Sequence, residues 1–133
     1  MTGRVGDSFV YIVEDDAAVQ QALSLLVQGR GFRVSTHVST EDFLASVEPQ
    51  AEQAQRACML LDLNLDNSDG ATLIENLRQR GSDLPVVVIT AQSDGSLAQR
   101  ATRAGALRII EKPFRNGEVL QAIADALTIQ LPS

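Results

Sequence analysis

The sequence predicts an α/β fold in which a parallel five-stranded sheet carries helices on both faces. Strand-like apolar runs and helical patterns alternate five times along the 133 residues, without an internal repeat. Most of the strand-like runs stay apolar until they end, as expected of strands buried on both faces. Right-handed crossovers between parallel strands then place helices on both sides. We therefore expect one doubly wound domain over residues 1–133, with its core at about 8–130.

Five runs are expected to form the strands. Four of them are short and apolar, and the run over 32–38 alternates instead, which indicates one wetter face and makes His37 a surface histidine. The predicted strands are Phe9–Val13, Phe32–Val38, Cys58–Asp62, Val86–Thr90 and Leu107–Glu111.

Helical spacing follows each strand. Asp16 is a natural N-cap for the first helix, and Ser39 or Thr40 for the second, which Pro49 would close. Residues 50–56 are compatible with either a helix extension or a loop, and residues 1–8 and 132–133 are expected to fray. The positions expected to face the core are Val19, Ala22, Leu23, Leu26 and Val27, then Phe43, Leu44 and Val47, then Leu73, Ile74 and Leu77, then Leu97, Ala101 and Ala104, and finally Val119, Leu120, Ile123, Ala124, Leu127 and Leu131.

The composition limits the class of protein. A hydrophobic fraction of 44% is ordinary for a globular chain, and the net charge of −6 argues against a nucleic-acid-binding surface. The single cysteine, Cys58, lies inside an apolar run and is expected to be a buried hydrophobe. Met1 is followed by polar residues, and no apolar run approaches membrane-spanning length. We therefore expect a cytoplasmic domain that binds neither nucleic acid nor membrane.

Chemically active side chains lie at or just after the ends of the predicted strands. Glu14 and Asp15 follow the first strand, Asp62 ends the third, Thr90 ends the fourth and Lys112 follows the fifth. The carboxyl ends of parallel strands share one edge, and neighbouring strands lie about 4.8 Å apart, so these side chains can share a pocket. Three carboxylates together repel unless positive charge intervenes. The lysine supplies one such charge, and Mg²⁺, which prefers oxygen ligands, supplies another.

This set of residue types suits phosphoryl transfer to a carboxylate. A nucleophilic carboxylate accepts a phosphoryl group as an acyl phosphate, while a metal, a lysine and a hydroxyl donor neutralise the phosphoryl oxygens. Asp62, Lys112 and Thr90 match these roles, and the small Ala91 leaves the approach open. Singly, each residue also has a bland interpretation, for example a strand-end cap for Asp62 or a solvated helix start for Glu14-Asp15-Asp16.

In this order and spacing, the motifs resemble the receiver domain of two-component response regulators, over about residues 8 to 130. The ending Ile110-Glu111-Lys112-Pro113-Phe114 most resembles the FixJ-type branch of this CheY-like superfamily. The motifs that carry the resemblance are Val13-Glu14-Asp15-Asp16, Asp62, Gly70, Thr90-Ala91, Ala104-Gly105-Ala106 and Glu111-Lys112-Pro113-Phe114.

The resemblance implies a flavodoxin-like sheet of strand order 2-1-3-4-5 and a phosphoacceptor role for Asp62, with a sensor histidine kinase as the partner. It further implies that Asp15, Asp62 and the backbone carbonyl of Asn64 bind Mg²⁺, with Glu14 acting through water. Such a domain is a signalling module that catalyses only its own phosphorylation and dephosphorylation.

The resemblance also implies a switch. Lys112 would pair with Asp62 or its phosphate, and Thr90 would move to the phosphate. This movement would alter the face made by helix four, strand five and helix five, which would then dimerise or control an output, expected to be transcription. We expect the chain to be a piece of a longer regulator rather than a stand-alone receiver.

Three departures from the family pattern modify these expectations. Asp66 stands where proline is common, which loosens the loop and slows phosphate acceptance. Ile109 stands where the family usually has Tyr or Phe, so the usual coupling of the threonine to an aromatic side chain is not expected. Arg108 stands where Asp is common and, with Arg100 and Arg103, forms a basic strip that we expect to assist partner docking.

Two other classes of protein fit the residues less well. A phosphohydrolase of the haloacid-dehalogenase type also uses a nucleophilic Asp after a strand, but needs a second carboxylate two residues on, where this chain has Asn64. A flavodoxin-like FMN carrier needs a Ser/Thr/Gly-rich phosphate loop after the first strand, and the chain has Glu14-Asp15-Asp16 there. A phosphorylation switch therefore fits the residues best.

Overall fold

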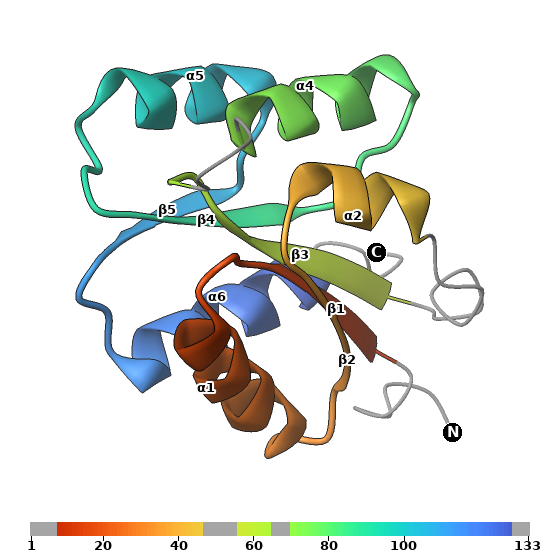
Figure 1. Ribbon diagram of the computed structural model, residues 1–133, viewed down its shortest axis with the longest axis vertical. Helices are drawn as coiled ribbons and strands as arrows, with labels where there is room; N and C mark the ends of the chain where they lie inside the picture. Colours follow the sequence, from red (N-terminus) through yellow and green to blue (C-terminus); the bar gives the residue numbers. More distant parts are fainter. Residues whose placement is uncertain (1–7, 47–55, 65–69, 129–133) are drawn as a thin grey trace.

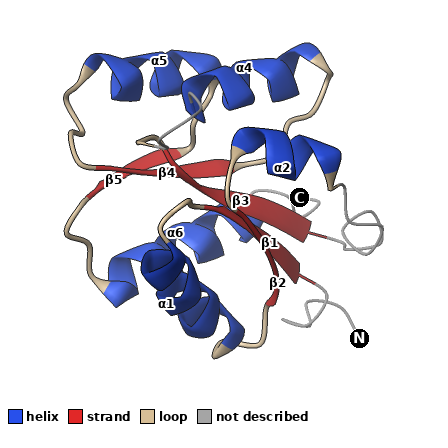
Figure 2. Ribbon diagram, viewed as in Figure 1, coloured by secondary structure: helices blue, strands red, loops and turns tan. Residues whose placement is uncertain are grey.

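The computed structural model of the protein describes residues 8–46, 56–64 and 70–128. Strands and helices alternate along this part of the chain, and Figures 1 and 2 show the helices in two layers around the sheet. The elements are β1 (Ser8–Val13), α1 (Ala17–Gln28), β2 (Arg33–His37), α2 (Thr40–Ala45), β3 (Arg56–Asp62), α4 (Gly70–Gln79), β4 (Val86–Thr90), α5 (Ser96–Ala104), β5 (Arg108–Glu111) and α6 (Asn116–Thr128).

The five strands form one parallel sheet in the order β2-β1-β3-β4-β5. This order confirms the predicted doubly wound α/β class. The strand ends are aligned, because Val13 pairs with Leu61, Asp62 with Ile89 and Thr90 with Glu111 in the parallel ladders. The residues that follow these strands therefore leave the sheet at a common edge.

Each face of the sheet has its own hydrophobic core. Helices α2, α4 and α5 cover one face, and α1 and α6 cover the other (Figure 1). The central strands alternate between the cores, so Met59 and Leu61 face the first and Cys58 and Leu60 the second, all at most 1% exposed. Burial on both faces explains why the sequence of β3 is uniformly apolar. It also confirms that Cys58 is a buried hydrophobe.

The predicted helix ends are largely correct. The Asp16 carboxylate accepts hydrogen bonds from the backbone N–H groups of Ala18 and Val19 at 2.9 and 3.1 Å, and Ser39 caps α2. Gly105 closes α5 with a φ of 112°, a left-handed conformation that favours glycine. Among the described residues, no helix has the length and apolarity needed to cross a membrane.

Some details differ from the sequence predictions. Ser8, expected to fray, is buried at the start of β1, and Arg56, expected in a helix extension or a loop, begins β3. Ala22 and Ala124, expected to face the core, are exposed, whereas Ala122 and Ala126 are buried in α6. The difference arises because an alanine methyl is too small to mark which helical positions face the core when apolar residues surround it. Val47, Pro49, residues 50–55 and Leu131 lie outside the described residues.

Candidate functional site

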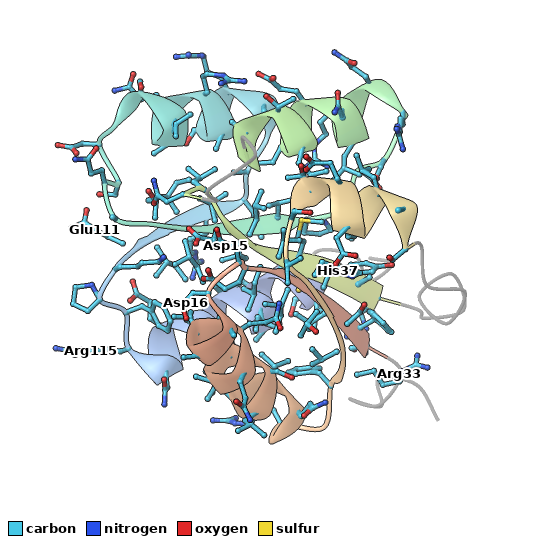
Figure 3. All side chains as sticks on the ribbon, in the orientation of Figure 1. Asp15, Asp16, Arg33, His37, Glu111 and Arg115 are labelled. Atoms are coloured by element: carbon cyan, nitrogen blue, oxygen red, sulfur yellow. The ribbon has the colours of Figure 1, made fainter. Side chains whose placement is uncertain are left out.

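Three carboxylates meet at the carboxyl edge of the sheet. Glu14 and Asp15 follow β1, Asp62 ends β3, and one carboxylate oxygen from each lies within 4.8 Å of the other two. Figure 3 shows Asp15 in the connection between β1 and α1. Glu14 and Asp62 are only 2% and 4% exposed, so their charges are poorly solvated. We call these three residues, together with Lys112 and Thr90, the acid pocket.

Glu14 is the least satisfied member of the acid pocket. Its Oε2 accepts a hydrogen bond from the Asp16 backbone N–H at 3.0 Å, but its buried Oε1 has no hydrogen-bond partner among residues 8–46, 56–64 and 70–128. Burial raises the pKa of Glu14 to about 7, and Asp62 pushes in the same direction, while the Asp16 N–H and the charge of Lys112 oppose it. Near neutral pH this carboxylate therefore favours additional positive charge.

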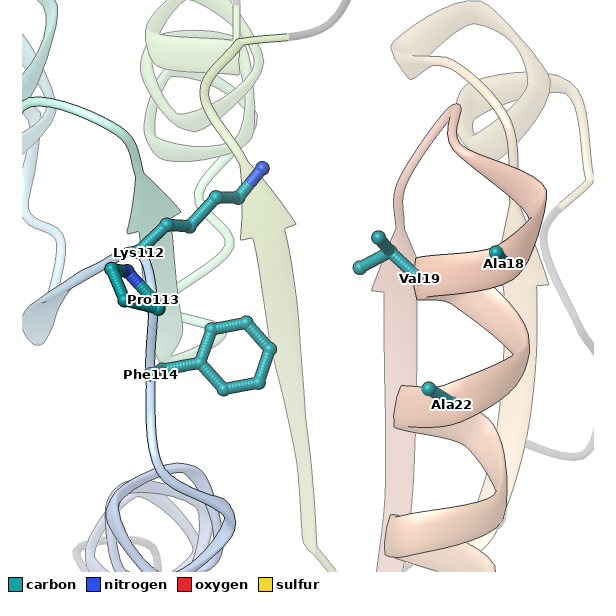
Figure 4. Close-up of a pocket in the computed structure, with 6 residues that line it drawn as sticks. All are labelled: Ala18, Val19, Ala22, Lys112, Pro113 and Phe114. Atoms are coloured by element: carbon teal, nitrogen blue, oxygen red, sulfur yellow. The ribbon is translucent and has the colours of Figure 1, made fainter.

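Lys112 supplies part of that charge. Its Nζ lies 3.3 Å from Asp62 Oδ2, and Figure 4 shows the side chain extending towards the carboxyl end of β3. Its backbone N–H donates to the Thr90 carbonyl at 2.8 Å, which anchors the lysine beside the end of β4. The Lys112–Pro113 peptide bond is cis. The predicted convergence of Glu14, Asp15, Asp62 and Lys112 is present in the structure.

Thr90 is buried and its hydroxyl is engaged by Asn64. Thr90 Oγ1 donates to Asn64 Oδ1 at 3.2 Å, and the Ala91 backbone N–H donates to the same oxygen at 3.0 Å. The Asn64 backbone N–H in turn donates to Asp62 Oδ1 at 2.9 Å. Sequence reasoning gave Asn64 only a backbone role. The side-chain role depends on how β3 and β4 align, and no sequence motif marks it.

Gly70 allows the chain to pass close to the backbone of Asp62. A Cβ at this position would lie 3.2 Å from the Asp62 carbonyl oxygen and 3.1 Å from Leu63 Cδ2. These distances are tighter than ordinary packing, so a side chain here would press on the residues that hold Asp62. Glycine at the start of α4 thus has a steric reason.

The oxygen donors of the acid pocket fit a hard divalent cation. Such ions take carboxylate and carbonyl oxygens, and Mg²⁺ in particular is held by one or two carboxylates plus waters and phosphate oxygens. The acid pocket offers three carboxylates, and the buried Oε1 of one of them, Glu14, has no partner within the described part of the chain. A bound cation would relieve both the repulsion among the acids and the missing partner of Glu14.

An apolar hollow of about 390 Å³ adjoins the acid pocket. It lies between the first turns of α1 and the segment after β5 (Figure 4). Its lining residues are Ala18, Val19, Ala22, Lys112, Pro113 and Phe114. The exposed methyl of Ala22 therefore faces this hollow rather than the core.

The basic strip is largely paired within the domain. Arg100 lies 3.0 Å from Glu75, and Arg108 lies 2.6 Å from Asp125. Surface pairs of this kind contribute little stability, but they reduce the free positive charge that a partner would meet. Ile109 is partly buried and packs against the core beneath α4 and α5.

The prediction that His37 is a surface histidine is wrong. His37 is 2% exposed, and its ring packs edge-on against Phe43 at 5.3 Å between centroids. Its Nε2 lies 2.8 Å from Ser35 Oγ, and its Nδ1 lies 3.5 Å from Asp42 Oδ2. In β2 the polar residues Ser35 and His37 occupy the buried positions. The wetter face of the strand is therefore the opposite one from the face that the sequence predicts. We call His37, Ser35, Asp42, Tyr11 and Phe43 the ring cluster.

The doubly wound sheet and the residues gathered at its carboxyl edge define a receiver-type signalling domain. Comparison with known proteins agrees: residues 10–124 match the family model described as response regulator receiver domain. The chain belongs to this family and is a receiver domain of two-component signalling.

Two curated relatives are named as regulators, and one solved structure has the same fold. The response regulator protein TmoT of Ectopseudomonas mendocina is 36% identical over 92% of this chain and 54% of its own length. The transcriptional regulatory protein TdiR of Thauera aromatica is 32% identical over 92% of this chain and 52% of its own length. The crystal structure of FixJ-N superposes with a TM-score of 0.82 at 32% identity, covering 95% of this chain and 98% of that one. The chain thus spans about half the length of these two curated relatives.

Proposed function

We propose that this domain is a phosphorylation-controlled switch in which Asp62 accepts a phosphoryl group from a sensor histidine kinase. The observation that carries the proposal is the position of Asp62. Its Oδ2 lies 3.3 Å from Lys112 Nζ, and one of its carboxylate oxygens lies within 4.8 Å of an oxygen of Glu14 and of an oxygen of Asp15. A buried carboxylate with a cation beside it and a metal-compatible donor set is arranged for attack on phosphorus.

Asp15, Asp62 and the Asn64 backbone carbonyl are the proposed Mg²⁺ ligands, with Glu14 acting through water. When bound, the ion would neutralise charge on the carboxylates and on the phosphoryl oxygens. Glu14 supports this assignment, since it belongs to the same cluster and its buried Oε1 lacks a partner among the described residues.

The protein's own groups have distinct roles in the transfer. An Asp62 carboxylate oxygen forms a bond to phosphorus as the bond from phosphorus to the donor's histidine nitrogen breaks, and the imidazole leaves with the electron pair. Lys112 stabilises charge on the transferred group from its position beside Oδ2. The Thr90 hydroxyl then donates to a phosphoryl oxygen. The domain also hydrolyses its own acyl phosphate, returning Asp62 to the free carboxylate.

The output is proposed to pass through the face formed by α5, β5 and α6. Here α5 and α6 are the fourth and fifth helices in the described part of the chain, so this is the face expected from the sequence. Thr90 ends β4, the strand that pairs with β5, so movement of its side chain acts directly next to this face. The chain corresponds to about half of relatives such as TdiR, a transcriptional regulatory protein. We propose that residues 1–133 form a single receiver domain in a cytoplasmic transcriptional regulator, and that phosphorylation favours a homodimer through this face. The net charge of −6 supports assigning DNA binding to another part of such a regulator.

The test is chemical labelling with acetyl phosphate and Mg²⁺, followed by intact mass. Wild type is expected to gain one phosphoryl group, and chelation of the metal should suppress the gain. Asp62→Asn should abolish labelling with little loss of stability, because it removes one of three crowded carboxylates. Asp94→Asn, which changes an exposed acid in the β4–α5 loop, is the matched control.

Two results would overturn the proposal. Labelling of Asp62→Asn at the wild-type rate would show that another residue is the acceptor. Repeated turnover of a phosphate monoester, without a stoichiometric labelled form, would indicate a hydrolase instead.

A further inference from the structure

The side chain of Asn64 accepts hydrogen bonds from two donors at the end of β4, one of which is Thr90 of the acid pocket. The Ala91 backbone N–H can only donate, so the Asn64 atom 3.0 Å from it is the amide oxygen, and the same oxygen lies 3.2 Å from Thr90 Oγ1. A single acceptor atom thus receives a hydroxyl and an amide from adjacent residues at the end of β4. Asn64 is also tied to the nucleophile, since its N–H donates to Asp62 Oδ1 at 2.9 Å.

In this arrangement the Thr90 hydroxyl donates its proton to Asn64. Thr90 Oγ1 accepts from the Gln92 backbone N–H at 3.2 Å, which occupies a lone pair and leaves its one proton for Asn64. A hydroxyl has only one proton to donate. Thr90 therefore cannot bind a phosphoryl oxygen on Asp62 while it donates to Asn64.

We infer that the Asn64 side chain is a latch that holds Thr90 and Ala91 in the unphosphorylated state by standing in for a phosphoryl oxygen. The inference rests on the proposed function and deepens it, since it assigns a positioning residue that sets how readily the switch turns on. Phosphorylation exchanges the Asn64 amide oxygen for a phosphoryl oxygen as acceptor of the same donors. The energy gained from the new hydrogen bonds is reduced by the loss of the old ones.

The direct test is the affinity for beryllofluoride, a non-transferable phosphoryl mimic, in the presence of Mg²⁺. Asn64→Ala removes the competing acceptor and is expected to bind beryllofluoride about tenfold more tightly than wild type, as follows from two hydrogen bonds of ordinary net strength. Gln92→Ala is the matched control, because it changes the same loop but keeps the backbone N–H that donates to Thr90. It should bind with wild-type affinity.

A double-mutant cycle tests whether the latch acts through the threonine. In a Thr90→Val background one of the two donors is already lost, so Asn64→Ala should yield a smaller gain than in wild type. A merely structural effect of Asn64→Ala would give the same gain in both backgrounds, and that result would overturn the inference.

A measurement on the unmutated protein guards against misfolding of the variants. The Ala91 amide should be protected from hydrogen exchange before any ligand is added, and Asn64→Ala should expose it. Failure of wild type to bind beryllofluoride at all would reject the proposed function together with the latch. Normal wild-type binding with no gain in Asn64→Ala, or rapid exchange of Ala91 in wild type, would reject the latch alone.

Discussion

The acid pocket and the ring cluster each contain buried polar side chains at the carboxyl edge of one sheet, yet they differ in how well the hydrogen-bonding groups of these side chains are satisfied. They are direct neighbours, since the Glu14 backbone N–H donates to the His37 carbonyl at 2.9 Å. In the ring cluster, polar contacts flank both ring nitrogens of His37, and aromatic rings surround it. In the acid pocket, three carboxylates crowd together and Glu14 Oε1 lacks a partner among the described residues.

The difference indicates that the ring cluster contributes to stability, whereas the acid pocket serves the function. Buried polar groups normally have their hydrogen bonds fulfilled, and an exception needs a reason such as a bound ion or a reaction. The ring cluster obeys this rule and is expected to act only as a support for β2 and α2. The acid pocket violates it, because Glu14 Oε1 lacks a partner among the described residues, and the cation of the proposed reaction would supply that partner.

The largest effect is expected for Lys112→Ala. Loss of the cation 3.3 Å from Asp62 should slow labelling by acetyl phosphate about a hundredfold to a thousandfold, as found when one preorganised electrostatic contact is removed from an active site. The initial rate by intact mass is the measurement. Arg115→Ala, an exposed cation three residues away, is the control, and equal slowing in both variants would refute the special role of Lys112.

Glu14→Gln should stabilise the metal-free protein at alkaline pH. The pKa of Glu14 in the folded protein, about 7, exceeds its ordinary value of 4.5, so the stability associated with its proton is present below pH 4.5 and is lost as the pH rises through 7. At pH 8 the glutamine should raise the free energy of unfolding by on the order of 2–3 kcal/mol, and at pH 4 by almost nothing. Urea unfolding in EDTA measures this.

The control for this charge change is Asp83→Asn, which removes an exposed acid in the connection between α4 and β4. It should alter stability little at either pH. A gain from Glu14→Gln that is the same at pH 4 and pH 8 would show that burial of the charge is not its cause.

The smallest effect on phosphate labelling is expected for His37→Phe, which tests whether the ring cluster and the acid pocket act independently. His37→Phe retains an aromatic ring but removes its contacts with Ser35 and Asp42, so the free energy of unfolding should fall by about 1–2 kcal/mol. The rate of acetyl phosphate labelling well below the melting temperature should stay at the wild-type value. A labelling defect as large as that of Lys112→Ala would mean that the two clusters act as one unit.

The features that could be predicted from the sequence are those that depend on the order of strands and helices along the chain. Alternating strands and helices require the strand ends to share an edge, so the meeting of Glu14, Asp15, Asp62 and Lys112 followed without knowledge of any distance. The N-cap role of Asp16 was similarly local, because a carboxylate before the first turn can satisfy orphan N–H groups.

What the sequence did not predict depends on packing. His37 alternates with Thr36 and Val38, and nothing in that pattern tells which set faces α2, so its burial was misassigned. The bond from Thr90 to Asn64 depends on side-chain geometry between strands whose residues are 26 positions apart. The exposed Ala22 and Ala124 show the same limitation, since one methyl gives too weak a signal of helix orientation.

The central claim, that the acids of this pocket share one divalent cation, is tested most directly by the pH dependence of Mg²⁺ affinity. If the cation competes with the proton on Glu14, whose pKa is about 7, the dissociation constant from amide chemical shifts should fall about tenfold between pH 6 and pH 8. In Glu14→Gln this change should disappear. Absence of Mg²⁺ binding, or the same pH dependence in both proteins, would contradict the account.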